Sequence, residues 1–250
     1  MRVGLIADIH GNLPALEKVL AELELDDVAQ VLCLGDVAIG PQPVETLERI
    51  RALGSPVTMG NWDAWYLSEM PKLDGELGRV LGDLRAWSMQ QLSDEHRRFV
   101  SEFPQTVEVP LEGGGKLLAF HGSPRSFDDS ILATTSDEEV ERMVGDRGAL
   151  VLAGGHTHFQ LFRRLGESVF VNPGSVGLPF RRMRPGIMRI APWAEYGVVS
   201  YDDSRLAVEL RRTAVDVDAF VGSMRSSGMP HADWWAELWQ EESPAASSFA

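Results

Sequence analysis

The 250-residue sequence is poor in cysteine, in basic residues and in long apolar stretches, and each shortage excludes a class of protein. A single cysteine, Cys33, excludes an internal disulfide, and its place within an apolar run suggests a small buried side chain. No apolar run approaches the roughly 20 residues that cross a bilayer. The N-terminus enters a strand-like segment without a basic leader. We therefore expect a cytoplasmic protein without a membrane partner.

Basic side chains are outnumbered by acidic ones. The chain has 23 Lys and Arg against 37 Asp and Glu, which gives a formal net charge of −14. Nucleic-acid backbones are bound through Lys and Arg, so this balance argues against general nucleic-acid binding. Most of the acidity is expected to serve solubility. A small phosphorylated substrate stays compatible with this charge if bound cations make its pocket locally positive.

What the sequence does contain is a repeated pattern: five short apolar runs, each ending beside glycine in a side chain that can bind a metal ion. The first run leads to Asp8 and His10, which face the same side because strand side chains alternate. The other runs cover residues 31–34, 56–59, 117–120 and 150–153, and lead to Asp36, Asn61, His121 and the pair His156 and His158. Sites in open α/β sheets form beyond the carboxyl ends of strands, so we expect these side chains to gather in one pocket.

The gathered side chains form a chemically coherent ligand set. Four of the six histidines lie in it, and imidazoles with carboxylates and one amide oxygen suit divalent ions. We expect Mn²⁺, with Fe, Zn, Ni or Co as alternatives. Seven ligands exceed the needs of one tetrahedral zinc ion, and suit two ions bridged by a carboxylate, for which Asp36 is the candidate. Each motif alone is more simply explained as a polar loop, whereas all five together favour a metal site.

These motifs resemble the five signature blocks of calcineurin-like metallophosphoesterases in order and rough spacing. The later Asn172-Pro173-Gly174-Ser175 is similar to the loop that follows them in the bacterial phosphodiesterase-like branch. The resemblance implies an α/β fold, namely a four-layer α/β/β/α sandwich of two mixed sheets with a helical insertion, and a centre of two divalent ions. It assigns the first ion to Asp8, His10 and His158, the second to Asn61, His121 and His156, and the bridge to Asp36.

One departure from the family pattern concerns Trp62. The family block usually reads Gly-Asn-His-Asp/Glu, and here it reads Gly60-Asn61-Trp62-Asp63. The missing histidine is the usual donor of a proton to the leaving group, and an indole N–H donates a hydrogen bond but no proton near neutral pH. The expected reaction is P–O cleavage of a phosphate diester by a metal-bridging hydroxide, with a preference for good leaving groups.

Several alternatives remain open from the sequence alone. Candidate substrate contacts are Asn12, Asn61 and Arg125, although Arg125 also suits an ordinary surface loop. The substrate is expected to be small and phosphorylated, and nucleotide-like if the Trp62 indole stacks on a base. A dinucleoside polyphosphate hydrolase, a protein phosphatase and a catalytically weak regulatory scaffold are the alternatives. No residue is assigned as the proton donor, although His96 is a candidate.

The chain is expected to form one metallophosphoesterase domain over residues 1–212. Residues 64–104 form a helical insertion, either a cap over the metals or a hairpin on the sheet edge. Residues 213–242 form a C-terminal helical segment, and 243–250 a disordered tail. Three tryptophans near residues 234–239 predict docking on this subunit or on a second copy in a homo-oligomer. The only basic cluster follows the Asn172 loop and is expected either to attract an anionic substrate or to be an arginine-rich loop balanced by acids. It comprises Arg181, Arg182, Arg184 and Arg189.

Overall fold

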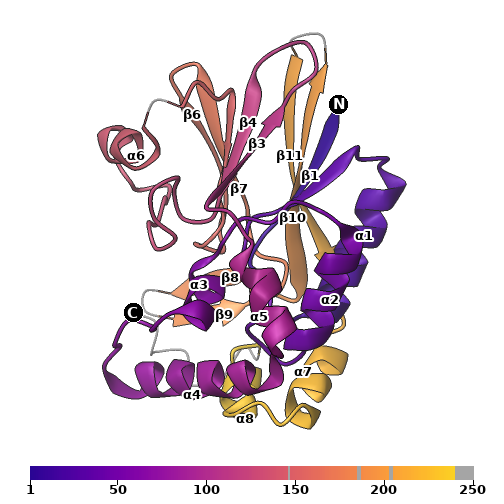
Figure 1. Cartoon of the computed structure of the whole chain (residues 1–250), viewed down its shortest axis with the longest axis vertical. Helices are drawn as coiled ribbons and strands as arrows, with labels where there is room; N and C mark the ends of the chain where they lie inside the picture. Colours follow the sequence, from indigo (N-terminus) through magenta and orange to yellow (C-terminus); the bar gives the residue numbers. More distant parts are fainter. Residues whose placement is uncertain (146, 185–186, 203–204, 240–250) are drawn as a thin grey trace.

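Two mixed β-sheets form the centre of the computed structural model, which describes residues 1–145, 147–184, 187–202 and 205–239 (Figure 1). The first sheet has the strand order β11-β10-β1-β2. Its strands are β1 (Arg2–Ile6), β2 (Gln30–Cys33), β10 (Trp193–Asp202) and β11 (Arg205–Ala214). β1 and β2 run parallel, while β10 pairs antiparallel with both β1 and β11. The hairpin expected at the end of the domain therefore closes the sheet that the N-terminus begins.

The second sheet has the strand order β3-β4-β5-β7-β6. Its strands are β3 (Thr106–Pro110), β4 (Lys116–Phe120), β5 (Val151–Ala153), β6 (Gln160–Leu165) and β7 (Ser168–Pro173). The three central strands β4, β5 and β7 are parallel, and β3 and β6 pair antiparallel at the edges. The carboxyl ends of β4 and β5 consequently reach the same edge of the sheet.

Side-chain alternation along these strands produces four layers. Leu5 of β1 and Leu117 of β4 belong to one core between the sheets. The neighbouring Ile6 packs outward with helices α1 (Leu13–Leu25) and α2 (Pro43–Leu53). Phe120 packs on the opposite side, against α6 (Asp137–Val144). Because adjacent strand residues face opposite sides, each strand serves two cores. The predicted α/β/β/α sandwich of two mixed sheets is confirmed.

Five further helices lie at one end of the molecule. The segment expected as an insertion contains α4 (Gly75–Gln91) and α5 (Asp94–Ser101), and α3 (Asn61–Leu67) runs into its start. The C-terminal segment contains α7 (Val217–Ser226) and α8 (Ala232–Glu237). Figure 1 shows α4, α7 and α8 side by side at the bottom, and His231 Nε2 lies 2.7 Å from Asp83 Oδ2 of α4. The expected tail at 243–250 lies outside the described residues, and the division into domains stays a prediction.

Two expectations about local structure were wrong. Residues 56–59 form only one isolated bridge, between Val57 and Cys33, because Met59 N–H turns away to the Pro104 carbonyl and α3 follows at once. The arginine cluster lies on a hairpin rather than in a loop, made of β8 (Phe180–Arg184) and β9 (Ile187–Ile190). Arg189 is only 4% exposed, so this arginine is not a surface cation.

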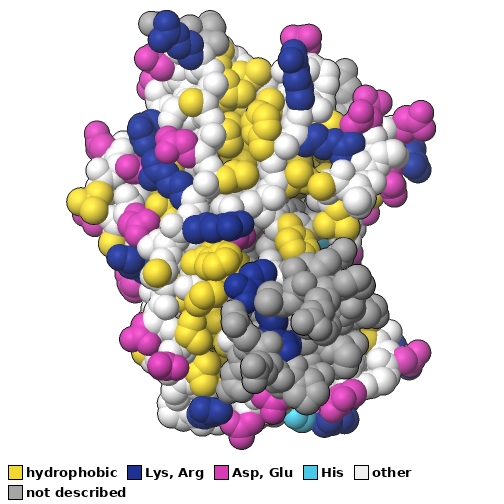
Figure 2. All heavy atoms as spheres, turned by 180° about the vertical axis from the view of Figure 1, so that it is seen from behind, with side chains coloured by type: hydrophobic (Ala, Val, Ile, Leu, Met, Phe, Trp, Pro, Cys, Tyr) yellow, Lys and Arg dark blue, Asp and Glu magenta, His cyan; other side chains and the backbone are white. Residues whose placement is uncertain are grey.

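The surface described by the structure mixes charged and apolar side chains. Figure 2 shows acidic and basic groups dispersed around a band of hydrophobic side chains on the rear face. Phe162, at 52% exposure, and Leu132, at 37%, are among the exposed large apolar residues. Cys33 is buried, as expected for a small apolar side chain. Among the described residues, no helix combines the length and apolar character that crossing a membrane requires.

Candidate metal centre

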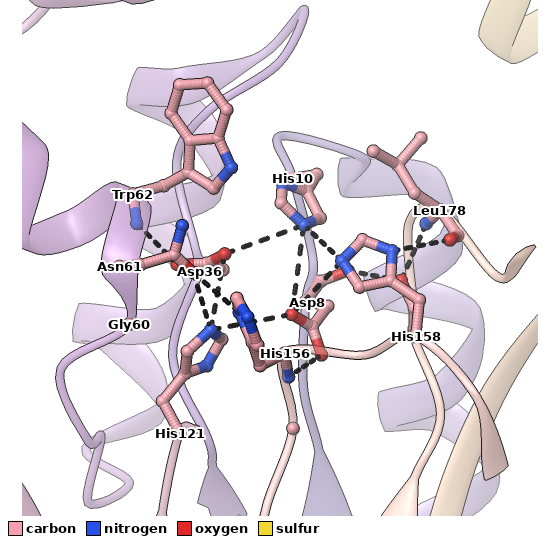
Figure 3. A network of polar contacts seen from close by, with 12 residues as sticks. Asp8, His10, Asp36, Gly60, Asn61, Trp62, His121, His156, His158 and Leu178 are labelled. Atoms are coloured by element: carbon pink, nitrogen blue, oxygen red, sulfur yellow. Dashed lines mark hydrogen bonds and ion pairs between the residues drawn. The ribbon is translucent and has the colours of Figure 1, made fainter. Parts of the chain in front are cut away.

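The seven predicted ligands meet at the carboxyl-terminal edge of the two sheets (Figure 3). They follow parallel strands in the chain, with Asp8 and His10 after β1, Asp36 after β2, His121 after β4, and His156 and His158 after β5. Asn61 is the first residue of α3. Residues far apart in sequence therefore share one site because their strands end at the same place.

The backbone of most candidate ligands is left-handed. Among the described residues, seven non-glycine residues have positive φ, and five of these are candidate ligands: Asp8, His10, Asp36, His156 and His158. This conformation costs about 1–2 kcal/mol for a residue with a Cβ atom. Strain of this kind concentrates at functional sites, where the direction of a side chain matters more than local stability. The chain thus turns at the ends of β1, β2 and β5 so that these side chains enter the pocket.

The first group of donors consists of Asp8, His10 and His158. His158 Nε2 lies 3.3 Å from Asp8 Oδ1 and 3.1 Å from His10 Nε2, while His10 Nε2 lies 3.9 Å from Asp8 Oδ1. All three atoms lie within 4.8 Å of one another, so one ion could contact them all. This group is the set that the family resemblance assigns to the first ion.

The second group surrounds the Asn61 amide. Asn61 Oδ1 lies 3.0 Å from His121 Nε2 and 3.0 Å from His156 Nδ1. Asp36 Oδ2 lies 3.5 Å from His121 Nε2 and 3.9 Å from His10 Nε2, which places this carboxylate between the two groups. Asp8 also approaches the second group, since its Oδ1 is 3.9 Å from His121 Nε2. Both aspartates are therefore positioned to be shared.

Two backbone carbonyls fix the orientation of imidazole rings. His121 Nδ1 donates to the Leu34 carbonyl and His158 Nδ1 to the Leu178 carbonyl, each at 2.7 Å. A carbonyl can only accept, so Nδ1 carries the proton in both rings. In the neutral imidazole this leaves the Nε2 lone pair directed at the pocket, which is the arrangement found in metal-ligating histidines.

The residues present fit a divalent metal ion. Asp8 is completely buried, and its Oδ1 has no hydrogen-bond partner among the described residues. Leaving a buried carboxylate oxygen unsatisfied is costly unless a cation compensates it. The neighbouring donors are imidazole nitrogens, carboxylate oxygens and the Asn61 amide oxygen, which suit borderline-to-hard divalent ions.

Burial and neighbouring charges shift the pKa values of the imidazoles in opposite directions. Burial, together with the charge of His158, lowers the pKa of His10 to about 4, and burial with the charge of His121 lowers the pKa of His156 to about 4. Burial opposes protonation of His121 as well, but the carboxylate of Asp36 outweighs it and raises the pKa of His121 to about 10. Without ions, the buried carboxylates are thus compensated by protons on particular imidazoles.

Asp63 is a positioning residue that the sequence analysis did not single out. Its buried carboxylate accepts from the backbone N–H groups of Asp36 at 2.7 Å, Gly60 at 3.1 Å and Val37 at 3.2 Å. It therefore joins the loop after β2 to the start of α3. Burial and the charge of Asp36 raise the pKa of Asp63 to about 7, against the effect of the three N–H donors. Its place in the Gly60-Asn61-Trp62-Asp63 block was the available signal.

The loop around Asn172 supports the histidines after β5. Asn172 Nδ2 donates to the Gly155 carbonyl at 2.7 Å and to Thr157 Oγ1 at 3.1 Å. Ser175 Oγ donates to the Asp8 carbonyl at 2.7 Å. This loop consequently holds the ends of β1 and β5 together from behind the candidate ligands.

Two of the candidate substrate contacts lie elsewhere in the structure. Asn12 is 1% exposed and caps α1, since its Oδ1 accepts from the Ala15 N–H and its Nδ2 donates to the Gly177 carbonyl. Arg125 is paired with Asp129 at 3.0 Å on an exposed loop. Neither residue lines the cavity beside the candidate centre, whereas Asn61 does.

His96 lies at the start of α5 rather than at the centre. Its Nε2 is 2.8 Å from Glu48 Oε1 of α2, and its Nδ1 is 3.1 Å from Ser93 Oγ. These contacts serve the N-terminus of α5, so His96 is placed as a structural residue. Trp62, in contrast, lies beside the cluster in Figure 3, and its backbone N–H donates to Asp36 Oδ1 at 2.9 Å.

Comparison with known proteins identifies the family. The family model of the calcineurin-like phosphoesterase superfamily domain matches residues 1–191. The chain belongs to this superfamily. Membership supports phosphoester hydrolysis as the general class of activity, and the candidate ligand groups agree with the superfamily's use of divalent metals.

Relatives of this superfamily member cover nearly its whole length. The uncharacterised protein MJ0912 of Methanocaldococcus jannaschii is 25% identical over 253 residues, which cover 94% of this chain and 96% of the relative. A metallophosphoesterase from Sphaerobacter thermophilus has a TM-score of 0.68 and 26% identity, covering 92% of this chain and 95% of its own. The hypothetical protein PH1004 from Pyrococcus horikoshii OT3 has a TM-score of 0.74 and 21% identity, covering 95% and 97% respectively. The last similarity concerns the fold alone.

Proposed function

We propose that the protein is a phosphodiesterase that depends on two divalent metal ions, with Mn²⁺ as the first candidate. The observation that carries the proposal is the meeting of two donor groups at Asp8, whose buried Oδ1 lacks a hydrogen-bond partner among the described residues. In this proposal Asp8, His10 and His158 hold one ion and Asn61, His121 and His156 the other. Asp36, which lies between the groups, bridges them.

The chain's own groups would bind and orient the phosphodiester. Two bound divalent ions supply a nucleophile from water near neutral pH and neutralise charge on the phosphoryl group. The Trp62 backbone N–H holds Asp36 Oδ1, which leaves Asp36 Oδ2 facing the imidazoles. The Asn61 amide offers its oxygen to the second donor group and its Nδ2 as a hydrogen-bond donor to a phosphoryl oxygen.

The leaving group must depart without a proton from position 62. General-acid help contributes about 10²–10⁴-fold in enzymes that have it. An indole cannot supply this proton, so esters with acidic alcohols are the preferred substrates in the proposal. Aryl diesters meet this requirement better than dialkyl diesters do.

The proposal is tested by metal content and hydrolysis together. Protein loaded with Mn²⁺ should hold two ions per chain and hydrolyse bis(p-nitrophenyl) phosphate, and chelation should remove both properties. Asp36→Asn should lower kcat/KM by more than about 100-fold, because changes behind metal ligands already cost about 10–100-fold. Asp94→Asn, at a side chain that is 97% exposed, is the matched control and should leave both unchanged. One ion per chain, or an active Asp36→Asn protein, would overturn the two-ion centre.

A further inference from the structure

A cavity of about 180 Å³ adjoins the candidate metal centre. Its floor is made of five candidate ligands, and every lining residue is buried or half-buried. Its opposite wall comes from the helices at the end of the molecule. This wall includes Leu81 and Leu84 of α4, Phe220 and Met224 of α7, Met229, and Trp235 of α8.

The wall offers almost nothing to a polar ligand. Among the described residues that line the cavity, none is Lys or Arg, and the carboxylate and imidazoles all belong to the floor. The polar side-chain atoms of the wall are the indole nitrogens of Trp62 and Trp235. Sugar hydroxyls or additional phosphates placed there would lose their water without gaining partners, which is unfavourable.

Within the described part of the chain, the indole N–H of Trp235 is a free hydrogen-bond donor for a single acceptor atom of a ligand. Trp235 is 6% exposed, and its Nε1 has no hydrogen-bond partner among the described residues. A buried N–H donor without a partner is unusual in a folded protein. The cavity is therefore suited to an apolar body that carries at most an isolated oxygen.

We propose that this cavity binds the apolar organic group of the phosphate ester, either one aromatic ring or a short alkyl chain. The proposal rests on the proposed function, because it places the phosphate at the floor and the organic group against the wall. The size agrees, since apolar cavities of ~150 Å³ bind benzene. Nucleotides and sugar phosphates are disfavoured as substrates for the same site.

The residues that select the substrate come largely from outside the superfamily domain. The match to that domain ends at residue 191, whereas Phe220, Met224, Met229 and Trp235 follow it. The contact between His231 and Asp83 joins this C-terminal part of the wall to α4. The segment expected as a docking helix therefore serves as a specificity element of the same subunit.

The test uses phosphonates, which keep the headgroup constant and are not hydrolysed. Binding of methyl-, propyl-, phenyl- and 2-hydroxyethylphosphonate to the Mn²⁺-loaded protein is measured by calorimetry. Affinity should rise about fourfold for each added methylene. Propylphosphonate should bind about tenfold or more tightly than the isosteric 2-hydroxyethylphosphonate, whose hydroxyl oxygen can at most accept from the Trp235 indole and whose O–H would be buried without an acceptor. Equal affinities across the series would overturn the inference.

Two variants test whether the wall causes the preference for propylphosphonate over 2-hydroxyethylphosphonate. Met229→Gln should reduce the preference for propyl over 2-hydroxyethyl several-fold. Met89→Gln, at a half-buried methionine of α4 that packs on the same core without lining the cavity, should keep it. Unchanged preference in Met229→Gln would overturn the assignment. Hydrolysis of bis(p-nitrophenyl) phosphate is followed separately: discrimination without hydrolysis contradicts the proposed function, and hydrolysis without discrimination contradicts only this inference.

Discussion

At the scale of single residues, the centre depends on side chains whose protonation and direction are set by burial. Asp36 and Asp8 are buried beside imidazoles, which lower the pKa of both carboxyl groups although burial alone would raise it. His121 holds a proton at neutral pH for the converse reason. The carboxylate oxygens are therefore ionised and oriented before any ion arrives.

Metal loading should release protons between pH 6 and pH 8. His121, with a pKa of about 10, is protonated in the ion-free protein, and ligation requires its Nε2 lone pair. His10 and His156, with pKa values of about 4, are already neutral and contribute no proton. Mn²⁺ affinity should consequently rise with pH, by up to about tenfold per unit for each proton released. Calorimetry in two buffers of different ionisation enthalpy measures the proton count, and a pH-independent affinity would contradict it.

Trp62→His should restore a proton donor beside the leaving group. We expect turnover of phenyl esters to rise at least about tenfold more than turnover of p-nitrophenyl esters, since only poor leaving groups need the proton. Steady-state kinetics on matched diesters measures this ratio. Trp65→His is the control, because Trp65 packs edge-on against Trp62 at 4.8 Å. Equal gains on both ester classes would refute the role given to position 62.

At the scale of elements, the junction between β2 and α3 is a tight contact behind the centre. A Cβ atom on Gly60 would lie 2.1 Å from Asp36 Oδ1 and 2.4 Å from Asp36 N. No side chain fits there without moving the carboxylate. Only glycine at position 60 therefore lets the start of α3 come this close to the loop after β2.

Gly60→Ala should destabilise the fold by about 1–3 kcal/mol, the usual cost of overpacking, and weaken Mn²⁺ binding by displacing Asp36. Urea unfolding and calorimetry measure the two effects. Gly82→Ala in α4 is the control, because nothing lies within 4 Å of the added atom and alanine favours a helix. Wild-type Mn²⁺ affinity in Gly60→Ala would show that Asp36 is not held by this junction.

The elements that the sequence predicted correctly are those with a local pattern. β1, β2, β4 and β5 were foreseen from apolar runs that stop at a glycine and a polar side chain. Their convergence followed from the rule that sites form at the carboxyl ends of parallel strands. The C-terminal helices were also foreseen, but their docking over the site was not, because contacts between segments far apart in sequence leave no periodic signal. Residues 56–59 look like a strand locally and lose that role to the helix that follows.

At the scale of the whole molecule, bound ions should stabilise the fold, because their site exists only where the two sheets meet in the folded chain. There the ions take over from protonated imidazoles in neutralising the buried carboxylates. Mn²⁺ at about 100 times its dissociation constant adds about 2.7 kcal/mol, which corresponds to roughly 5–11 °C in a chain of this size. Thermal unfolding with Mn²⁺ and with a chelator measures the shift. Asp36→Asn should show a much smaller shift, and an equal shift would place the stabilising ions elsewhere.

The order of the chain gives the covering helices a further consequence during biosynthesis. All seven donors precede residue 159, whereas α7 and α8 follow them in the chain. A ribosome-bound chain therefore carries every ligand before the part of the wall made by α7 and α8 exists, and the nascent ligands lack that cover until those two helices are synthesised.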